Sequence, residues 1–430
     1  MNRKLIWLSI GTLIVLVAMF VPNGSAAKEI VRPEEIRSMR QVVYSEETYA
    51  KLAGLWKEYS NEYPSEYAYA NWMYAARYAG DKKYWELLAK GLKKYPANPT
   101  LMYLKSLEHQ GVHNDVEGRK YLERVIAVDP NYVDAWFALV VRYMDLGDQE
   151  RLDVALRRLL ESGIIADEVM DYNYNMLASL QKDAILVTNG DNDTYPGWIL
   201  TRVLKVRPDV SIVNRSLLNT DWYPMYVTEH GLPRFISTSE LNDLRNSILR
   251  ESKKSDSSPS PGGLFGDVLI FKIIESAERA GRPVYLSRTV NVTGELKNVT
   301  EKGRNLGLVT LVTPSQTPYA EQLRKVYRTW IETFRTGGLE SWRLQNAPQA
   351  AAGRWLVTNY AAAVAADLES LRENAPELRT GLFRWYVDHV DGLIPEHSRY
   401  ETAQAWCCCA SDLKEIDSWC KEQGLKCNKQ

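Results

Sequence analysis

A proline-marked helical pattern is the feature that most constrains the fold of this chain. From residue 46 to residue 163, apolar side chains recur at helical spacing. Within this span the pairs Tyr63-Pro64, Tyr95-Pro96 and Asp129-Pro130 lie 32 and 34 residues apart. A period of this length is typical of helical repeats, in which each helix pair stacks on its neighbours to bury its apolar face. The pattern therefore predicts a stacked helical array.

The clearest copy of the pattern reads DPNYVDAWFALVVRYMDLGDQERLDVALRRLL. It resembles a tetratricopeptide repeat, because Trp136, Leu139, Tyr143 and Gly147 lie where such repeats place large residues, a tyrosine and a turn glycine. We therefore expect residues 28–168 to form degenerate tetratricopeptide-like repeats, with their aromatic side chains packed between repeats. The alternative is that these aromatic side chains line a peptide-binding groove.

The pattern changes after Leu180, where short β-rich apolar runs begin to alternate with helical stretches. This alternation predicts a small, mainly parallel α/β sheet within residues 169–316. The segment 253–263 is rich in Pro, Gly and Ser and predicts a mobile linker, whereas residues 317–430 return to helical periodicity. The predicted strands are residues 184–189, 210–219, 283–290 and 306–313. The predicted fold class is thus multidomain α and α/β.

The balance of charge argues against two classes of partner. The chain has 53 basic and 54 acidic side chains and a formal net charge of -1. Nucleic-acid-binding domains and proteins held on anionic membranes carry a basic surface, and this composition shows no such excess. We expect no nucleic-acid partner.

The N-terminus predicts export. Arg3 and Lys4 precede an apolar run from Leu5 to Val21, and small residues follow up to Ala27. This order is typical of a signal peptide spanning residues 1–27, and an uncleaved signal anchor is the alternative. We expect a periplasmic or otherwise extracytoplasmic protein that contacts the membrane only if this segment is uncleaved.

All five cysteines fall within the last 24 residues. In an exported protein this clustering predicts a local disulfide clasp in the C-terminal helical region, whereas a metal site would show paired CxxC spacing, which is absent. The disulfide candidates are Cys407, Cys408, Cys409, Cys420 and Cys427.

Matching polar motifs follow the first two predicted strands. Residues 193–196 read DTYP and residues 221–224 read DWYP, and each motif opens a predicted helix. Ligands of open parallel sheets bind beyond the carboxyl ends of the strands, so we expect both motifs to face one crevice. The ligand-binding candidates are Asn189, Asp191, Asn192, Asp193, Asn219, Asp221, Trp222 and, at the end of the third strand, Arg288.

Three interpretations of these motifs remain open. Asp193 or Thr194, and Thr220 or Asp221, suit the N-cap of a helix whose first turn holds proline. Alternatively, Asp191 and Asp193 form an Asp-x-Asp pair that holds a divalent cation, as in many nucleotide-sugar glycosyltransferases. The third interpretation is direct hydrogen bonding to a sugar or peptide. The sequence contains no Walker motif, no GxGxxG motif after a predicted strand and no GxSxG motif. It therefore offers no other recognisable catalytic motif.

One long segment resembles a known family. The stretch TNGDNDTYPGWILTRVLKVRPDVSIVNRSLLNTDWY resembles the soluble extracytoplasmic portion of bacterial protein O-mannosyltransferase-like membrane proteins, and RPVYLSRTV with GLVTLVTP is similar to its later strands. Together these segments span residues 183–314. The resembled proteins also carry a multi-helix membrane half, where glycosyl transfer from a lipid-linked sugar is expected. Because this sequence lacks that half, the resemblance implies the soluble module without transferase activity.

These observations predict an exported, non-catalytic binding or assembly protein of envelope glycan or glycoprotein biology. It would act through the α/β crevice and the helical repeats, with envelope proteins as partners and a sugar-containing ligand. One alternative is a metal-dependent enzyme that processes glycans or nucleotide sugars, using the Asp-Asn-Asp loop at 191–193 and a divalent cation as cofactor. The other is a pure tetratricopeptide scaffold.

Overall fold

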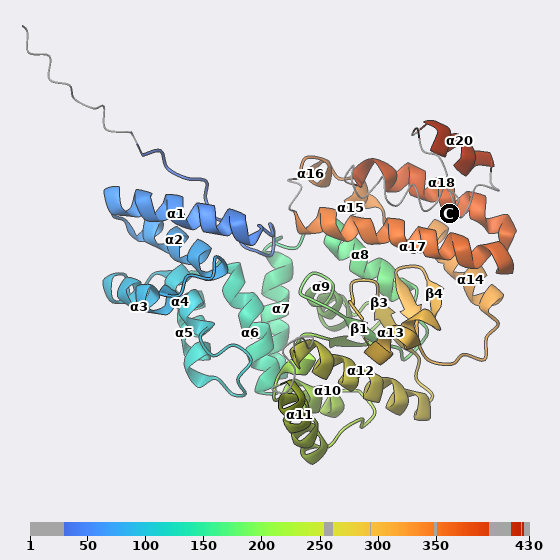
Figure 1. Cartoon of the computed structure of the whole chain (residues 1–430), viewed down its shortest axis with the longest axis horizontal. Coiled ribbons are helices and arrows are strands. Elements are labelled where there is room, and N and C mark those ends of the chain that lie inside the picture. The colour runs from blue at the N-terminus through green and yellow to red at the C-terminus, as the bar shows by residue number, and fades with distance from the viewer. Residues whose placement is uncertain are drawn as a thin grey trace, which may run out of the picture.

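The fold is that of a computed structural model, which describes residues 30–252, 261–292, 294–347, 351–394, 414–422 and 424. Figure 1 shows a helical array on one side, joined to a sheet that is covered by further helices. The predicted fold class is therefore confirmed. The predicted signal segment 1–27 and most of the predicted linker lie outside the described residues. Residues 261–263 of that linker belong instead to a helix.

The helical array contains α1 to α7, whose starts follow the sequence signals. Side chains of Ser45, Ser65 and Asn98 each accept a backbone N–H bond at the start of a helix. Gly80 and Gly147 take positive φ angles of 68° and 69° at the turns between helices. The bounds are α1 Glu46–Glu62, α2 Glu66–Tyr78, α3 Tyr84–Lys94, α4 Pro99–Ser106, α5 Val116–Val128, α6 Val133–Asp145 and α7 Gln149–Glu161.

The sheet follows α8 (Asp167–Ala178) and has five strands in the order β2-β1-β3-β5-β4. The central strand β1 runs parallel to both β2 and β3, and all four of its residues are buried. Strand β5 pairs antiparallel with β3 and with β4. The bounds are β1 Ile185–Thr188, β2 Ser211–Asn214, β3 Val284–Ser287, β4 Arg304–Leu306 and β5 Val309–Leu311.

The sheet is mixed rather than mainly parallel, because the run 306–313 is not a single strand. Gly307 adopts φ 72° and reverses the chain, so β4 and β5 form a hairpin around it. The second predicted strand is also shorter than 210–219. It ends at Asn214, whose side-chain oxygen accepts the N–H of Leu217 (2.8 Å) and turns the chain into a 3-10 helix.

Helices cover both faces of the sheet. Figure 1 places α10, α11 and α12 on one side and α8 with α17 on the other. The helices of the α/β part are α9 Tyr195–Trp198, α10 Tyr223–Glu229, α11 Thr238–Ser252, α12 Pro261–Arg279 and α13 Gly294–Glu301. Those of the C-terminal part are α14 Tyr319–Arg328, α15 Gly337–Glu340, α16 Trp342–Gln345, α17 Ala352–Asn374, α18 Arg379–His389 and α20 Lys414–Glu422.

A buried carboxylate joins the C-terminal helices to the sheet. Asp367 of α17 accepts the indole N–H of Trp330 (3.0 Å) and the backbone N–H of Gly307 (3.0 Å). Burial raises the pKa of Asp367 to about 6. Cys420, on α20, is disulfide-bonded, and the other four cysteines lie outside the described residues. Within the described ranges, no helix is both long and apolar enough to span a membrane.

Candidate functional site

Asp193 is buried beneath the loop that leaves the central strand. Its side chain is about 3% exposed and accepts the backbone N–H groups of Asn189 (2.7 Å) and Gly190 (2.8 Å). The hydroxyl of Thr289, just past β3, donates to the same carboxylate. Burial raises the pKa of Asp193, and these three hydrogen bonds oppose that rise. Asp193 therefore fixes the shape of the loop from below.

Asp191 points the other way. Its carboxylate is 38% exposed and forms an ion pair with Arg40, from the segment before α1. The backbone oxygen of Asp191 accepts the N–H groups of Thr194 (3.3 Å) and Tyr195 (3.0 Å), which starts α9. The two carboxylates of the Asp-x-Asp pair thus face different surroundings, one inside the fold and the other toward its surface.

The predicted capping roles of the two aspartates are not found. The first residue before α9 makes no side-chain cap, and Asp193 instead holds the end of β1. At α10, the N–H of Tyr223 donates to the hydroxyl of Thr220 (3.3 Å), so the other predicted candidate, Thr220, accepts a helix N–H in place of Asp221. The aspartates in the two motifs are therefore not equivalent helix caps.

The second motif is more open than the first. Asp221 is 56% exposed and forms an ion pair with Arg245 of α11. Trp222 is buried with its ring edge-on to Tyr223, at 5.4 Å between ring centroids. The amide nitrogen of Asn219 donates to the carbonyl of Ser216 (3.2 Å), while its buried Oδ1 has no hydrogen-bond partner within the described residues.

Arg288 does not reach the crevice, contrary to the expectation from its place after the third strand. Its Nε donates to the carbonyl of Gly307 (2.9 Å), and its guanidinium also contacts Asn305 (3.4 Å). It therefore braces the β4–β5 hairpin. Its neighbour Thr289 is the residue from this strand end that contacts the candidate loop.

A pocket lies between the two motifs and the helical array, and we call it the interface pocket. The motif side contributes Asp191, Asn214, Ser216, Thr220 and Trp222. The facing wall is formed by residues of α2, α4 and α6 and of the turn after α4, among them Tyr78, Tyr103, Leu107, Ala138 and Arg142. The pocket thus combines hydrogen-bonding groups with aromatic rings, as ligand pockets commonly do.

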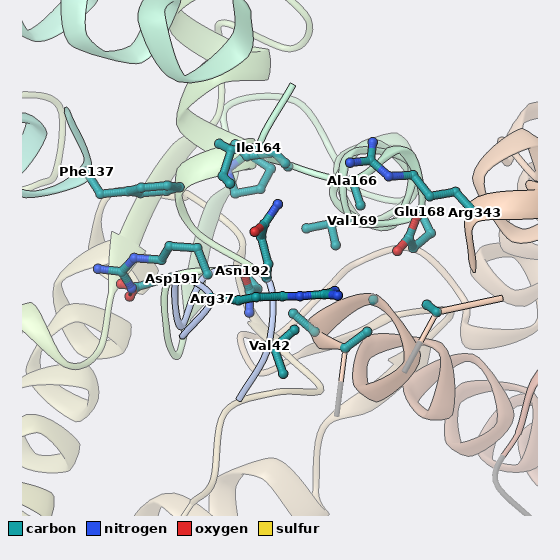
Figure 2. Close-up of a pocket in the computed structure, with 18 of the residues that line it drawn as sticks. Arg37, Val42, Phe137, Ile164, Ala166, Glu168, Val169, Asp191, Asn192 and Arg343 are labelled. Atoms are coloured by element: carbon teal, nitrogen blue, oxygen red, sulfur yellow. Dashed lines mark ion pairs between the residues drawn. The ribbon is translucent and has the colours of Figure 1, made fainter. Parts of the chain in front are cut away.

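A second pocket, which we call the arginine pocket, lies on the other side of the loop. Its lining includes Arg37, Arg40, Glu168, Asn192 and Arg343. Figure 2 shows Arg37 and Asn192 in the middle of this pocket, between Asp191 on one side and Glu168 with Arg343 on the other. Arg40 and Asp191 line both pockets, so their ion pair forms part of the wall between them.

Glu168 is the buried acid of the arginine pocket. It is about 5% exposed, its Oε2 has no hydrogen-bond partner among the described residues, and burial raises its pKa. It packs on the start of α17, where a Cβ on Gly353 would lie 1.9 Å from its Oε1. Glycine at residue 353 is therefore required for this packing.

Several residues of the two pockets were not predicted from the sequence. Asn214 is the last residue of an apolar strand, and its position at a carboxyl strand end could have marked it. Thr220 was predicted as an N-cap candidate but not as a pocket residue. Arg40 and Glu168 carry no such signal, because only the tertiary fold brings them to the loop.

Among the residues that the structure describes, no group of three or more His, Cys, Asp or Glu side chains is placed to hold a metal ion. The predicted metal ligands Asp191 and Asp193 are both engaged by other groups, as described above. A hard cation prefers several oxygen ligands that converge on one point, and these two carboxylates do not converge.

Comparison with known families gives one match. The family described as TMEM260-associated domain 2 matches residues 169–229, which run from α8 to the end of α10. The matched segment contains β1, β2 and both polar motifs, so this part of the chain is similar to that domain. No curated protein matches the chain significantly.

Proposed function

We propose that this protein is a non-catalytic binding protein of the cell envelope and that the interface pocket binds a sugar-containing ligand. One observation carries the proposal: residues of both polar motifs line a single pocket with aromatic side chains from the helical array. A pocket that combines the ends of two neighbouring strands with a wall from another part of the chain is the arrangement expected of a binding site.

The chemistry of the interface pocket suits a polar ligand, because charged side chains such as Arg77 and Arg142 line it beside neutral hydrogen-bonding groups. Asn214, Ser216 and Thr220 carry hydrogen-bonding groups, and Tyr78 and Trp222 offer aromatic surface. Sugars present hydroxyl groups at their edges and apolar C–H faces, which such a mixture of side chains matches. A sugar is therefore the ligand class that the pocket supports best.

The setting in envelope glycan biology rests on the sequence comparisons. The match to a TMEM260-associated domain agrees with the resemblance of residues 183–314 to the soluble portion of O-mannosyltransferase-like proteins. The predicted signal segment supports a periplasmic or extracytoplasmic location. Within this setting, the helical array would recruit envelope proteins in the manner of tetratricopeptide repeats.

The contacts of the Asp-Asn-Asp loop favour binding over metal-dependent catalysis. Asp193 already accepts three hydrogen bonds, and Asp191 already pairs with Arg40. A catalytic cation at these residues would require breaking the contacts that shape the loop. For this reason we do not propose an enzymatic role.

The proposal is tested by calorimetric titration of mannose-terminated and other envelope oligosaccharides into the purified chain. Ala138 lines the interface pocket, so Ala138→Trp is expected to fill it and to weaken sugar binding at least about tenfold, or about 1.4 kcal/mol. Val154→Trp, at an exposed position of α7, is the matched control. The proposal fails if no sugar binds the wild-type chain, or if Ala138→Trp binds sugar as the control does.

A further inference from the structure

The segment that precedes α1 lies along the helical array, and we call its residues 34–42 the strap. Residues 30–38 form neither helix nor strand. The strap then turns, because the N–H groups of Gln41 and Val42 both donate to the carbonyl of Ser38 (2.9 and 3.1 Å). Most of its residues are exposed or half-buried, and Val42 alone among them is buried. The strap is thus laid on the surface rather than built into the core.

Side chains of the array hold the backbone of the strap. The indole N–H of Trp56 donates to the carbonyl of Glu34 (2.9 Å). Asn71 accepts the N–H of Ile36 (3.0 Å), and the hydroxyl of Tyr74 accepts the N–H of Met39 (3.2 Å). Because these bonds involve only the strap's backbone, any peptide that follows the same path could form them.

Two strap side chains are recognised as well. The hydroxyl of Ser38 donates to Asp134 (2.5 Å), which is about 4% exposed and also accepts the hydroxyl of Tyr74 (3.1 Å). The guanidinium of Arg40 lies over the ring of Phe137, 4.8 Å from its centroid, and pairs with Asp191. The side-chain contacts therefore recognise a hydroxyl residue followed two positions later by an arginine.

The strap lies in a groove on the surface of the helical array and leaves part of that groove open. A hollow beside it is lined by the ends of α2, α4 and α6, including Asn98 and Asn131. The array side of this hollow carries Glu66, Asp129 and Asp134, and no lysine or arginine lies among its described lining residues. The strap adds Glu35, Ile36 and Ser38 to the lining, so the charged groups among the described lining residues are all acidic. An arginine of a docked segment is complementary to this acidic lining, which is how interfaces select partners by charge.

We propose that this groove docks a non-helical segment of a partner protein with a Ser/Thr-x-Arg motif, and that the strap is an internal competitor for it. When a partner displaces the strap, the partner's arginine replaces Arg40 in the wall between the interface and arginine pockets. The inference deepens the proposed binding function by naming a partner class. Its test measures peptide binding, so its failure is distinct from a failure to bind sugar.

The test uses a fluorescent synthetic peptide with the sequence IVRPEEIRSMRQVV, residues 30–43, and the full chain. The double substitution Ser38→Ala and Arg40→Ala weakens the strap in the chain, with Val43→Ala, at an exposed neighbouring residue, as control. Since a competitor lowers apparent affinity by the fraction of time it occupies the groove, the double variant should bind the peptide about tenfold more tightly than wild type or control. A peptide carrying Arg40→Ala should bind at least about tenfold more weakly.

Two results would overturn the inference. One is the absence of tighter peptide binding by a double variant that melts cooperatively and is therefore folded. The other is equal binding of the peptide that lacks the arginine. If the double variant does not fold, hydrogen exchange of the wild-type chain decides. Exchange of the Ile36 and Met39 amides by local opening, before the amides of α2 and α6, supports a displaceable strap, whereas exchange only on global unfolding contradicts it.

Discussion

The two polar motifs differ in the structure far more than they do in the sequence. DTYP follows β1 and DWYP follows β2, yet Asp193 is about 3% exposed while the Asp221 side chain is 56% exposed. The difference follows from the sheet order. Strand β1 lies between β2 and β3, so the end of β3 covers its loop, whereas β2 is an edge strand. A repeated motif therefore specifies a repeated turn, while the position in the sheet decides what the acid does.

The features that the two motifs share lie in their Tyr-Pro pairs. Both prolines occupy the first turn of a helix, where a missing N–H is tolerated. Both tyrosines are buried and bonded through their hydroxyls. Tyr195 donates to the carbonyl of Phe137 in α6 (3.1 Å), and the Tyr223 hydroxyl accepts the N–H of Asn214 (3.1 Å). The shared Tyr-Pro pair thus fixes the start of a helix in both motifs. The aspartate of each motif makes different contacts.

The largest expected effect is that of removing the buried acid. Asp193→Ala would leave two backbone N–H groups and one hydroxyl without their acceptor, and we expect a loss of about 3 kcal/mol in the free energy of unfolding. Urea denaturation measures it, with Asp221→Ala as the matched substitution in the other motif. Equal losses for the two variants would contradict the comparison.

The buried acid should also make stability depend on pH. Burial raises the folded-state pKa of Asp193 above its unfolded value of about 3.9, so protonation favours the folded chain. This contribution is fully present below about pH 4 and is lost as pH rises through the folded pKa. Asp193→Asn removes the titration. We therefore expect wild type to lose stability relative to that variant as pH rises above about 4.

Urea midpoints of the two chains, measured side by side across this range, check the pH prediction. Asp221→Asn, measured in parallel, controls for pH effects elsewhere in the chain. A difference between wild type and Asp193→Asn that does not change with pH would show that burial does not control the ionisation of Asp193.

Substitutions of Tyr195 and Tyr223 test the contacts that the two motifs have in common. Tyr223→Phe leaves the buried N–H of Asn214 unpaired, and Tyr195→Phe leaves the carbonyl of Phe137 without this donor. We expect each to lower the free energy of unfolding by about 1 kcal/mol. Hydrogen exchange should place the two effects apart: Tyr195→Phe should loosen α6, and Tyr223→Phe should loosen the end of β2. Loosening of α6 by both variants would contradict this assignment.

The fold was predictable where local pattern and tertiary structure agree. The run ILVT predicted the central strand because all four residues of β1 are buried and three of them are apolar. The run LGLVTLVT misled because a single glycine inside it, Gly307 at φ 72°, turns one apparent strand into part of a hairpin. An apolar run predicts that a segment is buried, but it does not predict the direction in which its strand runs in the sheet. Parallel pairing could therefore not be extended to the last two strands.

The candidate site was predictable in place but not in detail. The strand ends marked the loop 189–193, and the helical pattern marked the array that faces it. Nothing in the sequence linked Arg40 to Asp191, because 151 positions separate them and the strap has no periodic pattern. Long-range ion pairs depend on the packing of whole domains. The sequence likewise did not show that Arg288, at the end of the third strand, would bond to the β4–β5 hairpin instead of reaching the crevice.

A smaller effect is expected from the exposed acid. Asp221 pairs with Arg245 at the surface, and exposed ion pairs contribute little, so Asp221→Ala should change the free energy of unfolding by less than about 1 kcal/mol. Arg245→Ala should cost more, because Arg245 also donates to the carbonyl of Thr220 (3.1 Å) and lies over the ring of Phe265. Urea denaturation of both variants checks the order, and a larger loss for Asp221→Ala would reverse the roles assigned here.

The smallest effect on stability is expected from divalent cations, which would have to bind the Asp-x-Asp pair. The oxygens of Asp193 accept backbone N–H groups, and the carboxylate of Asp191 forms an ion pair with Arg40. Thermal unfolding with Mg²⁺, Mn²⁺ or Ca²⁺ at about 1 mM should therefore reveal less than about 0.4 kcal/mol of stabilisation, the value for a dissociation constant near 1 mM. Arg40→Ala frees Asp191 but leaves Asp193 in place, so it should remain equally insensitive. A larger shift in wild type that Asp191→Asn abolishes would show that the loop rearranges around a cation, and both the buried role of Asp193 and the non-catalytic proposal would then have to be abandoned.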